Sequence, residues 1–268
     1  MIYFNSEKKI NELKQKINKD NICVFMDYDK TITSSESQDS WDASANKEVM
    51  GEKIIKDLNK YYEKYGIIEF DYHIDKNKRE KYIIEWYDKC MDLYYHYGLT
   101  KEKLKKSIDN SKLILREGAK DFLFKLYENN VPVIIFSAGI GNVIEQFLRN
   151  EKCYYGNITI IGNFMKFDEN GNIMKFSDNM IHSLNKNIDK LSDYKLKEKI
   201  EEKEYRIVIG DLVEDINMMG EYPEHKSLKI GFLNKNITKN LEVYRKKFDI
   251  VLTEENSFYD IEKYINTI

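Results

Sequence analysis

The chain has 268 residues, of which 42% are hydrophobic and 33% charged, and its formal net charge is -3. This composition is that of a folded globular protein, and the length allows one large α/β domain or a core domain with an insertion. The slight acidic excess argues against a nucleic-acid partner, which normally requires a basic face.

Targeting signals and cysteines also limit the function. The first 20 residues are lysine-rich without an apolar core, and no apolar run is long enough to span a bilayer, so we expect neither a signal peptide nor a membrane partner. Cys23, Cys90 and Cys153 are far apart in the sequence and form no Cys-x-x-Cys pair. They predict neither a disulfide framework nor a zinc site, and they fit a reducing, cytoplasmic location.

The first predicted elements are an amphipathic helix at residues 7–18 and an apolar strand at residues 22–26, which ends at Asp27 and Asp29. Such a strand is typical of a buried parallel sheet, whose carboxyl edge holds the chemistry in open α/β folds. Two carboxylates two residues apart in extended backbone point to the same side. They favour Mg²⁺ and phosphoryl-transfer chemistry, although the same pattern also occurs in solvated turns.

The next 80 residues change character. Residues 31–46 are polar and predict a mobile flap beside the site. Residues 47–111 carry apolar and aromatic side chains at helical spacing, and no buried strand is evident among them. We therefore predict a helical cap domain at residues 41–112, inserted into a core formed by residues 1–40 and 113–268. Most of the cap tyrosines are expected in its core, and some could stack on a flat ligand.

Alternating helices and strands return after the cap. Helices are predicted at residues 119–128, 142–149 and 259–265, and strands at 132–136, 158–161, 206–209, 228–232 and 250–252, with a hairpin at 164–176 that turns at Asn170-Gly171. This order predicts a doubly wound, Rossmann-like parallel sheet with the inserted cap. The small residues from Ser137 to Gly141 open a helix, where backbone amides could approach a phosphate.

Polar residues at the ends of these elements form one set. Phosphoryl transfer needs a nucleophile, an acid/base, donors for phosphate oxygens, a lysine and carboxylates for a metal ion. Each residue also has an ordinary structural explanation, such as a helix cap or a turn, but the joint occurrence favours catalysis. The candidates are Asp27, Asp29, Ser137, Lys186, Asp211 and Asp215.

These motifs resemble those of the haloacid dehalogenase superfamily of phosphohydrolases. Longer segments resemble the cytosolic pyrimidine 5′-nucleotidases of type III, from about residue 24 to the C-terminus. They are FSAGIG at 136–141, NFM at 163–165 with FDE at 167–169, IH at 181–182 with NK at 185–186, and EWY at 85–87.

The resemblance implies a role for each matching position. Asp27 would be the nucleophile that forms an aspartyl-phosphate, and Asp29 the acid/base. Mg²⁺ would be held by Asp27, the main-chain carbonyl of Asp29 and Asp211, with Asp215 close behind. The phosphate would be held by Ser137, the Ala138 amide and Lys186.

Base recognition would fall to Glu69, within the segment IIEFD at 67–71. A carboxylate only accepts hydrogen bonds and can therefore read an exocyclic amine. Without the resemblance, Glu69 would be one exposed glutamate among many. Two departures affect the base and flap contacts: residues 32–44 are unlike the family's loop and shorter, and Cys90 stands where the family has a serine.

The sequence thus predicts a Mg²⁺-dependent 5′-nucleotidase acting on a small-molecule nucleotide, preferably a pyrimidine such as CMP or UMP. Transfer of the phosphate to another nucleoside stays open, as does the oligomeric state. Two alternatives remain, a small-metabolite phosphatase of the phosphoserine type and a non-catalytic nucleotide- or phosphopeptide-binding module. Intact Asp27 and Asp29 argue against the second.

Overall fold

A mostly parallel sheet of seven strands forms the centre of the computed structural model, which describes residues 1–69, 74–176, 180–190, 193–253 and 256–265. The strand order is β1-β9-β8-β7-β2-β3-β4, and only the edge pair β1–β9 is antiparallel. Strand β2 (Ile22–Met26) lies between β7 (Tyr205–Gly210) and β3 (Val133–Ile140). The predicted α/β fold class is confirmed, and the strand that ends at Asp27 lies inside the sheet, with a parallel neighbour on each side.

The alternating side chains of the strands supply both faces of the sheet. On β2, Ile22, Val24 and Met26 face a cluster that includes α1 (Glu7–Lys16), α7 (Ala119–Glu128), α8 (Gly141–Asn150) and α11 (Phe258–Glu262). Cys23 and Phe25 face the other side, toward α9 (Tyr194–Glu201). All five residues of β2 are fully buried, which explains its continuous apolar sequence.

The predicted strands and helices occur; residues 22–26 and 119–128 match at both ends, and the others have shifted ends. The other strands are β4 (Ile158–Asn163), β8 (Ser227–Leu233) and β9 (Ile250–Thr253), and α10 (Ile237–Arg245) lies between the last two. The hairpin is β5 (Met165–Phe167) with β6 (Ile173–Phe176). Strand β1 (Ile2–Phe4) was not predicted, because three residues at a sheet edge are too short to show a period.

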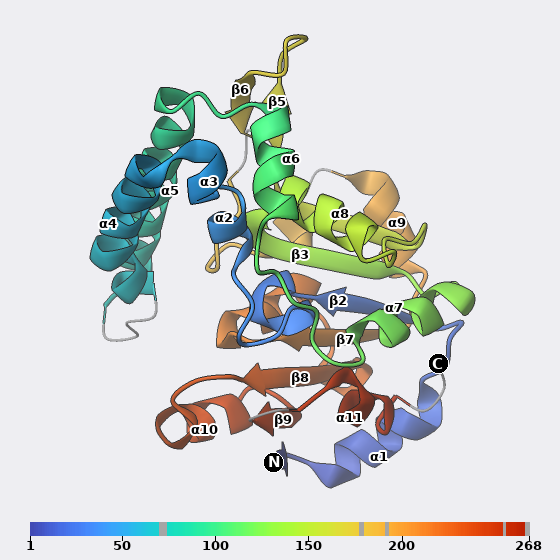
Figure 1. Cartoon of the computed structure of the whole chain (residues 1–268). Helices are drawn as coiled ribbons and strands as arrows, with labels where there is room; N and C mark the ends of the chain where they lie inside the picture. Colours follow the sequence, from blue (N-terminus) through green and yellow to red (C-terminus); the bar gives the residue numbers. More distant parts are fainter. Residues whose placement is uncertain (70–73, 177–179, 191–192, 254–255, 266–268) are drawn as a thin grey trace.

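The inserted region contains the helices α4 (Glu52–Glu69), α5 (Lys76–His96) and α6 (Lys101–Asp109). Helices α4 and α5 pack together at the end of the sheet toward which the strand arrows point (Figure 1). Residues 31–46 were expected to form a flap. Instead they carry the short helix α2 (Ser40–Ala43), followed by α3 (Lys47–Met50), and Ser40, Ala43 and Ser44 are buried.

The two chain segments that lead into and out of this region lie side by side. Thr33 pairs with Leu115 in an antiparallel bridge, and the Arg116 amide donates to the Ile32 carbonyl (2.8 Å). The Arg116 side chain also donates from Nε to the Thr31 carbonyl (2.9 Å). This pairing lies near both predicted domain boundaries, which remain a prediction.

The packing of the central strands predicts a large loss of stability on truncation. Ile207 of β7 is fully buried between the neighbouring strands. We expect Ile207→Ala to lower the free energy of unfolding by about 2–5 kcal/mol in urea titrations, because the lost methyl groups leave a cavity. The control is Val243→Ala on α10, where the valine is 47% exposed and the change should stay within about 0.5 kcal/mol. Equal losses of unfolding free energy in the two variants would show that Ile207 does not contribute more to core packing than Val243.

Candidate active site

One cavity of about 810 Å³ extends from the carboxyl ends of the strands to the inserted helices. At the sheet end its lining includes Asp27 after β2, residues 137–139 of β3, and Asp211 after β7. The loop residue Lys186 joins them. The strand-end residues predicted from the sequence therefore meet in one place.

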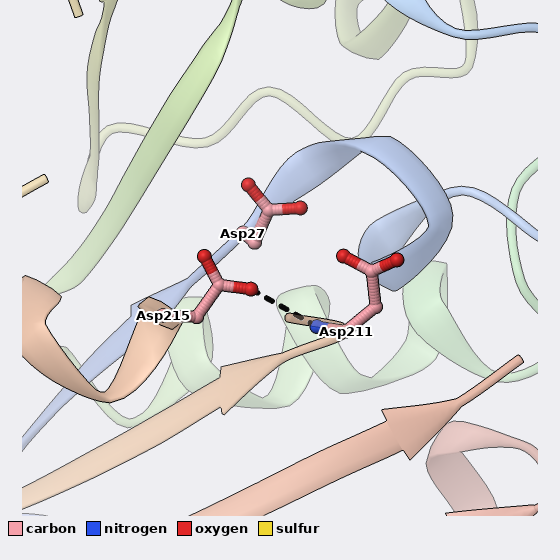
Figure 2. A group of neighbouring side chains, drawn as sticks. All are labelled: Asp27, Asp211 and Asp215. Atoms are coloured by element: carbon pink, nitrogen blue, oxygen red, sulfur yellow. Dashed lines mark hydrogen bonds between the residues drawn. The ribbon is translucent and has the colours of Figure 1, made fainter. Parts of the chain in front are cut away.

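Three carboxylates form the centre of this end of the cavity. Oxygen atoms of Asp27, Asp211 and Asp215 all lie within 4.8 Å of one another. Figure 2 shows the three side chains converging from the end of β2, from the end of β7 and from the short helix that follows β7 (Val213–Met219). Burial and the neighbouring carboxylates raise the pKa of Asp211 well above its ordinary value, and burial raises that of Asp27. Such a cluster of oxygen donors with excess negative charge fits a hard divalent cation such as Mg²⁺.

Lys186 is the cation that the chain itself places in the cluster. Its Nζ forms an ion pair with Asp27 and another with Asp215, the latter at 2.9 Å. The lysine is 3% exposed, and the two carboxylates hold its pKa above the ordinary range despite burial. One ammonium among three carboxylates leaves the cluster negative.

Asp215 reaches the cluster through a tight backbone turn. Its Oδ2 accepts hydrogen bonds from the amides of Asp211 (3.1 Å, dashed in Figure 2) and Leu212 (2.9 Å). A Cβ atom on residue 210 would lie 2.4 Å from the Asp215 Cβ, so Gly210 is required at the end of β7. The Gly-Asp pair of the sequence motif is thus explained by steric fit.

Asp29 lies beside this cluster, and its side chain bonds elsewhere. The Ser40 amide donates to its Oδ1 (2.8 Å), and the Ser40 hydroxyl donates to its Oδ2 (2.6 Å). Burial, with added repulsion from Asp39 and Asp27, raises the pKa of Asp29 to about 8. A carboxyl group that holds its proton near neutral pH can serve as a general acid.

Two of the predicted phosphate-binding residues, Ser137 and Ala138, are neighbours in a bulge of β3, where the pairing with β4 shifts between Phe136 and Ile140. Ser137 is 1% exposed, and its Oγ accepts the Gly139 amide (3.0 Å). Ala138 lines the cavity, and its carbonyl accepts from Asn163 at the end of β4 (2.9 Å). The Asn163 side chain also bonds both main-chain groups of Ile181, which connects the bulge to the loop that carries Lys186.

The other end of the cavity is aromatic and acidic. It is lined by Glu69 at the end of α4 and by Trp86, Tyr87 and Cys90 of α5. Burial raises the pKa of Glu69, while Ser183 and Lys186 act in the opposite direction. Residues 70 and 71 of the predicted base-reading segment lie outside the described residues.

Several residues at the site were not predicted to act there. Trp41 donates its indole N–H to the Ala138 carbonyl (3.2 Å) and packs on Tyr87, with ring centroids 4.8 Å apart. Asn234 donates to the Lys30 carbonyl (2.9 Å) beside Asp211. Asn163 and Asn234 follow strands, so the rule that selected Asp27 could have found them. No pattern in the sequence distinguishes Ser40 or Trp41.

The family model described as pyrimidine 5′-nucleotidase (UMPH-1) matches residues 29–268. The chain belongs to the pyrimidine 5′-nucleotidase family. This confirms the resemblance found in the sequence, and it places the chain among phosphoric monoester hydrolases. The matched range begins at Asp29 and does not include Asp27, which the geometry places in the carboxylate cluster.

Individual relatives agree with the family. The chain is 32% identical to the human 7-methylguanosine phosphate-specific 5′-nucleotidase over 244 residues, covering 89% of this chain and 81% of the relative. Its Drosophila melanogaster counterpart is 28% identical, with 87% and 76% covered.

The fold is similar to solved structures of the same kind. Cytosolic 5′-nucleotidase IIIB bound to cytidine superposes with a TM-score of 0.86 at 25% identity, covering 99% of this chain and 93% of that one. A substrate-bound phosphoserine phosphatase has a TM-score of 0.57 at 20% identity, with 91% and 98% covered, which shows the shared fold alone. Within the described ranges, no helix is both long and apolar enough to cross a membrane.

The environment of Asp29 predicts a pH-dependent stability. Folding raises its pKa to about 8, so between about pH 4 and 8 the folded chain holds a proton that the unfolded chain has released. Stability in EDTA should therefore fall as the pH rises through this range. Asp29→Asn should make the fall shallower in urea titrations at pH 5 and pH 8.

Asp168 provides the control. Its pKa is lowered by hydrogen bonds from Asn172, so it stays ionised in both states across this range. Asp168→Asn should leave the difference between pH 5 and pH 8 unchanged. An Asp29→Asn protein with the wild-type pH dependence would show that Asp29 is ionised in the folded chain at neutral pH.

Proposed function

We propose that this chain is a Mg²⁺-dependent 5′-nucleotidase that hydrolyses nucleoside 5′-monophosphates in the cytosol. The observation that carries the proposal is a single cavity with two unlike ends. A carboxylate cluster with one lysine lies at the sheet end, and an acidic, aromatic pocket lies at the helical end. Chemistry at the first end needs only a phosphate, so the second end is available to select the base.

The proposed reaction has two steps. Asp27 attacks phosphorus to form an aspartyl-phosphate while Asp29 protonates the leaving 5′-oxygen. Asp29 then takes a proton from water, which attacks the phosphoryl group and releases phosphate and free Asp27. Ser137, the Ala138 amide and Lys186 hold phosphate oxygens. Mg²⁺, held by Asp27, the Asp29 carbonyl and Asp211 with Asp215 behind, would offset the charge on the phosphate.

The pyrimidine named by the family model is the first candidate for the base, and cytidine occupies the related cytosolic enzyme. A second candidate is 7-methylguanine, after which the human and fly relatives are named. Besides Asp27, Asp29 and Asp211, the cavity is lined by Asp39, Asp42 and Glu69, together with Trp41 and other aromatic rings. Carboxylates and aromatic faces both favour a cationic base, and the base of a 7-methylguanosine nucleotide carries a positive charge.

A phosphate-release panel tests the proposal. We expect turnover of CMP, UMP or 7-methyl-GMP well above that of phosphoserine, with activity lost in EDTA and restored by Mg²⁺.

Asp27→Asn should abolish turnover without unfolding the chain, because the amide cannot attack phosphorus. A second nucleoside added as acceptor would reveal phosphate transfer in competition with hydrolysis. Preference for phosphoserine would favour the small-metabolite phosphatase, and binding without turnover would favour the non-catalytic module.

Glu69 predicts where base preference comes from. Glu69→Gln replaces one acceptor oxygen with a donor and should lower kcat/KM for CMP by about one to two decades, corresponding to the roughly 1.5–3 kcal/mol of a hydrogen bond to a charged group. Hydrolysis of p-nitrophenyl phosphate, which has no base, should hardly change. The measurement is the ratio of the two activities in wild type and variant. An unchanged ratio would show that Glu69 does not contact the base.

A further inference from the structure

We propose that Ser40 is a positioning residue for the acid/base Asp29 and orients its carboxyl group toward the leaving oxygen of the substrate. The inference rests on the proposed function, because it assumes that Asp29 transfers the proton. It assigns a role to the segment of the chain that departs most from the family's sequence pattern.

The contact is specific because one residue holds both oxygens of the carboxyl group. The Ser40 amide donates to Oδ1 at 2.8 Å and the Ser40 hydroxyl donates to Oδ2 at 2.6 Å. The torsion that turns an aspartate carboxyl group has broad minima, so rotamer preference alone does not fix its plane. Two donors from one rigid residue fix it.

Ser40 is itself held in place from two sides. Its Oγ accepts the Ile140 amide at 3.2 Å, which leaves the hydroxyl hydrogen free to point at Asp29. Its backbone lies at the first position of α2, where the Asp39 side chain caps the helix by accepting the Asp42 amide at 2.7 Å. Ser40 is fully buried, so water does not compete for either bond.

The bulge of β3 is shaped to admit this contact. A Cβ atom on residue 139 would lie 1.9 Å from the Ser40 Oγ and 2.7 Å from the Asp29 Oδ2. Only glycine at position 139 leaves the two side chains in contact. The strand that supplies the phosphate-binding residues therefore also makes room for the serine and the acid.

The arrangement leaves Asp29 able to act. Each carboxyl oxygen has two lone pairs, and Ser40 occupies one on each. The acid proton can occupy a remaining lone pair and move from Asp29 to the leaving oxygen as the bond to phosphorus breaks. Ser40 keeps its own proton and contacts no reacting atom.

Leaving-group dependence tests this role. We would measure kcat/KM of Ser40→Ala for phenyl phosphate and for p-nitrophenyl phosphate, two aryl esters without a nucleobase. Phenolate is the more basic leaving group and depends more on the acid. General acid catalysis is worth about 10²–10⁴-fold, so we expect Ser40→Ala to lose about tenfold more activity on phenyl phosphate.

The ratio of the two substrates separates positioning from folding. Both rates scale with the amount of folded enzyme, so partial unfolding cancels in the ratio. Ser44→Ala is the matched control, since Ser44 is equally buried in the same segment and bonds the Trp41 carbonyl (2.6 Å) and Tyr94 instead of Asp29. It should keep the wild-type ratio, and so should Ser40→Thr, which retains the hydroxyl.

Asp29→Asn in the same assay separates the positioning role of Ser40 from the acid role of Asp29. If Asp29→Asn shows the selective loss on phenyl phosphate and Ser40→Ala does not, the positioning role is wrong and the proposed function stands. If Asp29→Asn itself shows no selective loss, Asp29 is not the acid, and both that assignment and the positioning role of Ser40 fail, while the nucleotide panel still tests the nucleotidase activity. A selective loss in Ser40→Ala and Asp29→Asn, absent from Ser44→Ala, supports the inference.

Discussion

The site depends on the ion pairs of one buried ammonium with two of three crowded carboxylates. Lys186 bridges Asp27 and Asp215, and all three residues are less than 5% exposed. Removing such charges from water costs several kcal/mol per ion, and one lysine cannot neutralise three carboxylates. The amides of residues 211 and 212 stabilise Asp215, so the unbalanced charge falls on Asp27 and Asp211. A bound cation would offset this excess negative charge, and it would allow an anionic substrate group to bind beside the carboxylates.

Polar bridges between loops hold this arrangement in place. Asn163 connects the β3 bulge to the loop before Lys186, and Asn234 connects the Lys30 carbonyl to the Asp211 region. Arg116 donates to the Thr31 carbonyl and to Asn234 (3.0 Å), and its guanidinium lies over the Phe232 ring. Asn234 and Arg116 come from different parts of the chain, and both bond carbonyls of the one turn that follows β2. The geometry of the turn is therefore set by contacts distant in sequence.

The difference between local sequence patterns and contacts distant in sequence explains which parts of the site could be predicted. Asp27, Ser137 and Asp211 follow apolar runs, and in a parallel sheet all such ends meet at one edge. Their convergence followed from local pattern alone. Glu69 was placed in the cap only through family resemblance, and the structure does place it in the cavity wall. Ser40 lies in a polar segment whose sequence predicts a loop, and its contact with Asp29 depends on where the chain returns after α2. Contacts of this kind carry no periodic signal.

The contacts of α5 with the core connect the two ends of the cavity. Arg79 pairs with Glu214 (3.7 Å), the neighbour of Asp215, and Glu80 lies 3.3 Å from His182 in the loop that leads to Lys186. His182 accepts the Leu184 amide at Nδ1, so its other nitrogen carries the proton directed at Glu80. Arg79 also donates to the Glu69 carbonyl (3.0 Å), which connects the end of α4 to the same helix turn. Two adjacent residues of α5 thus contact the neighbour of Asp215, the loop that leads to Lys186, and the end of α4 that carries Glu69. One turn of α5 therefore joins the sheet end of the cavity to its helical end.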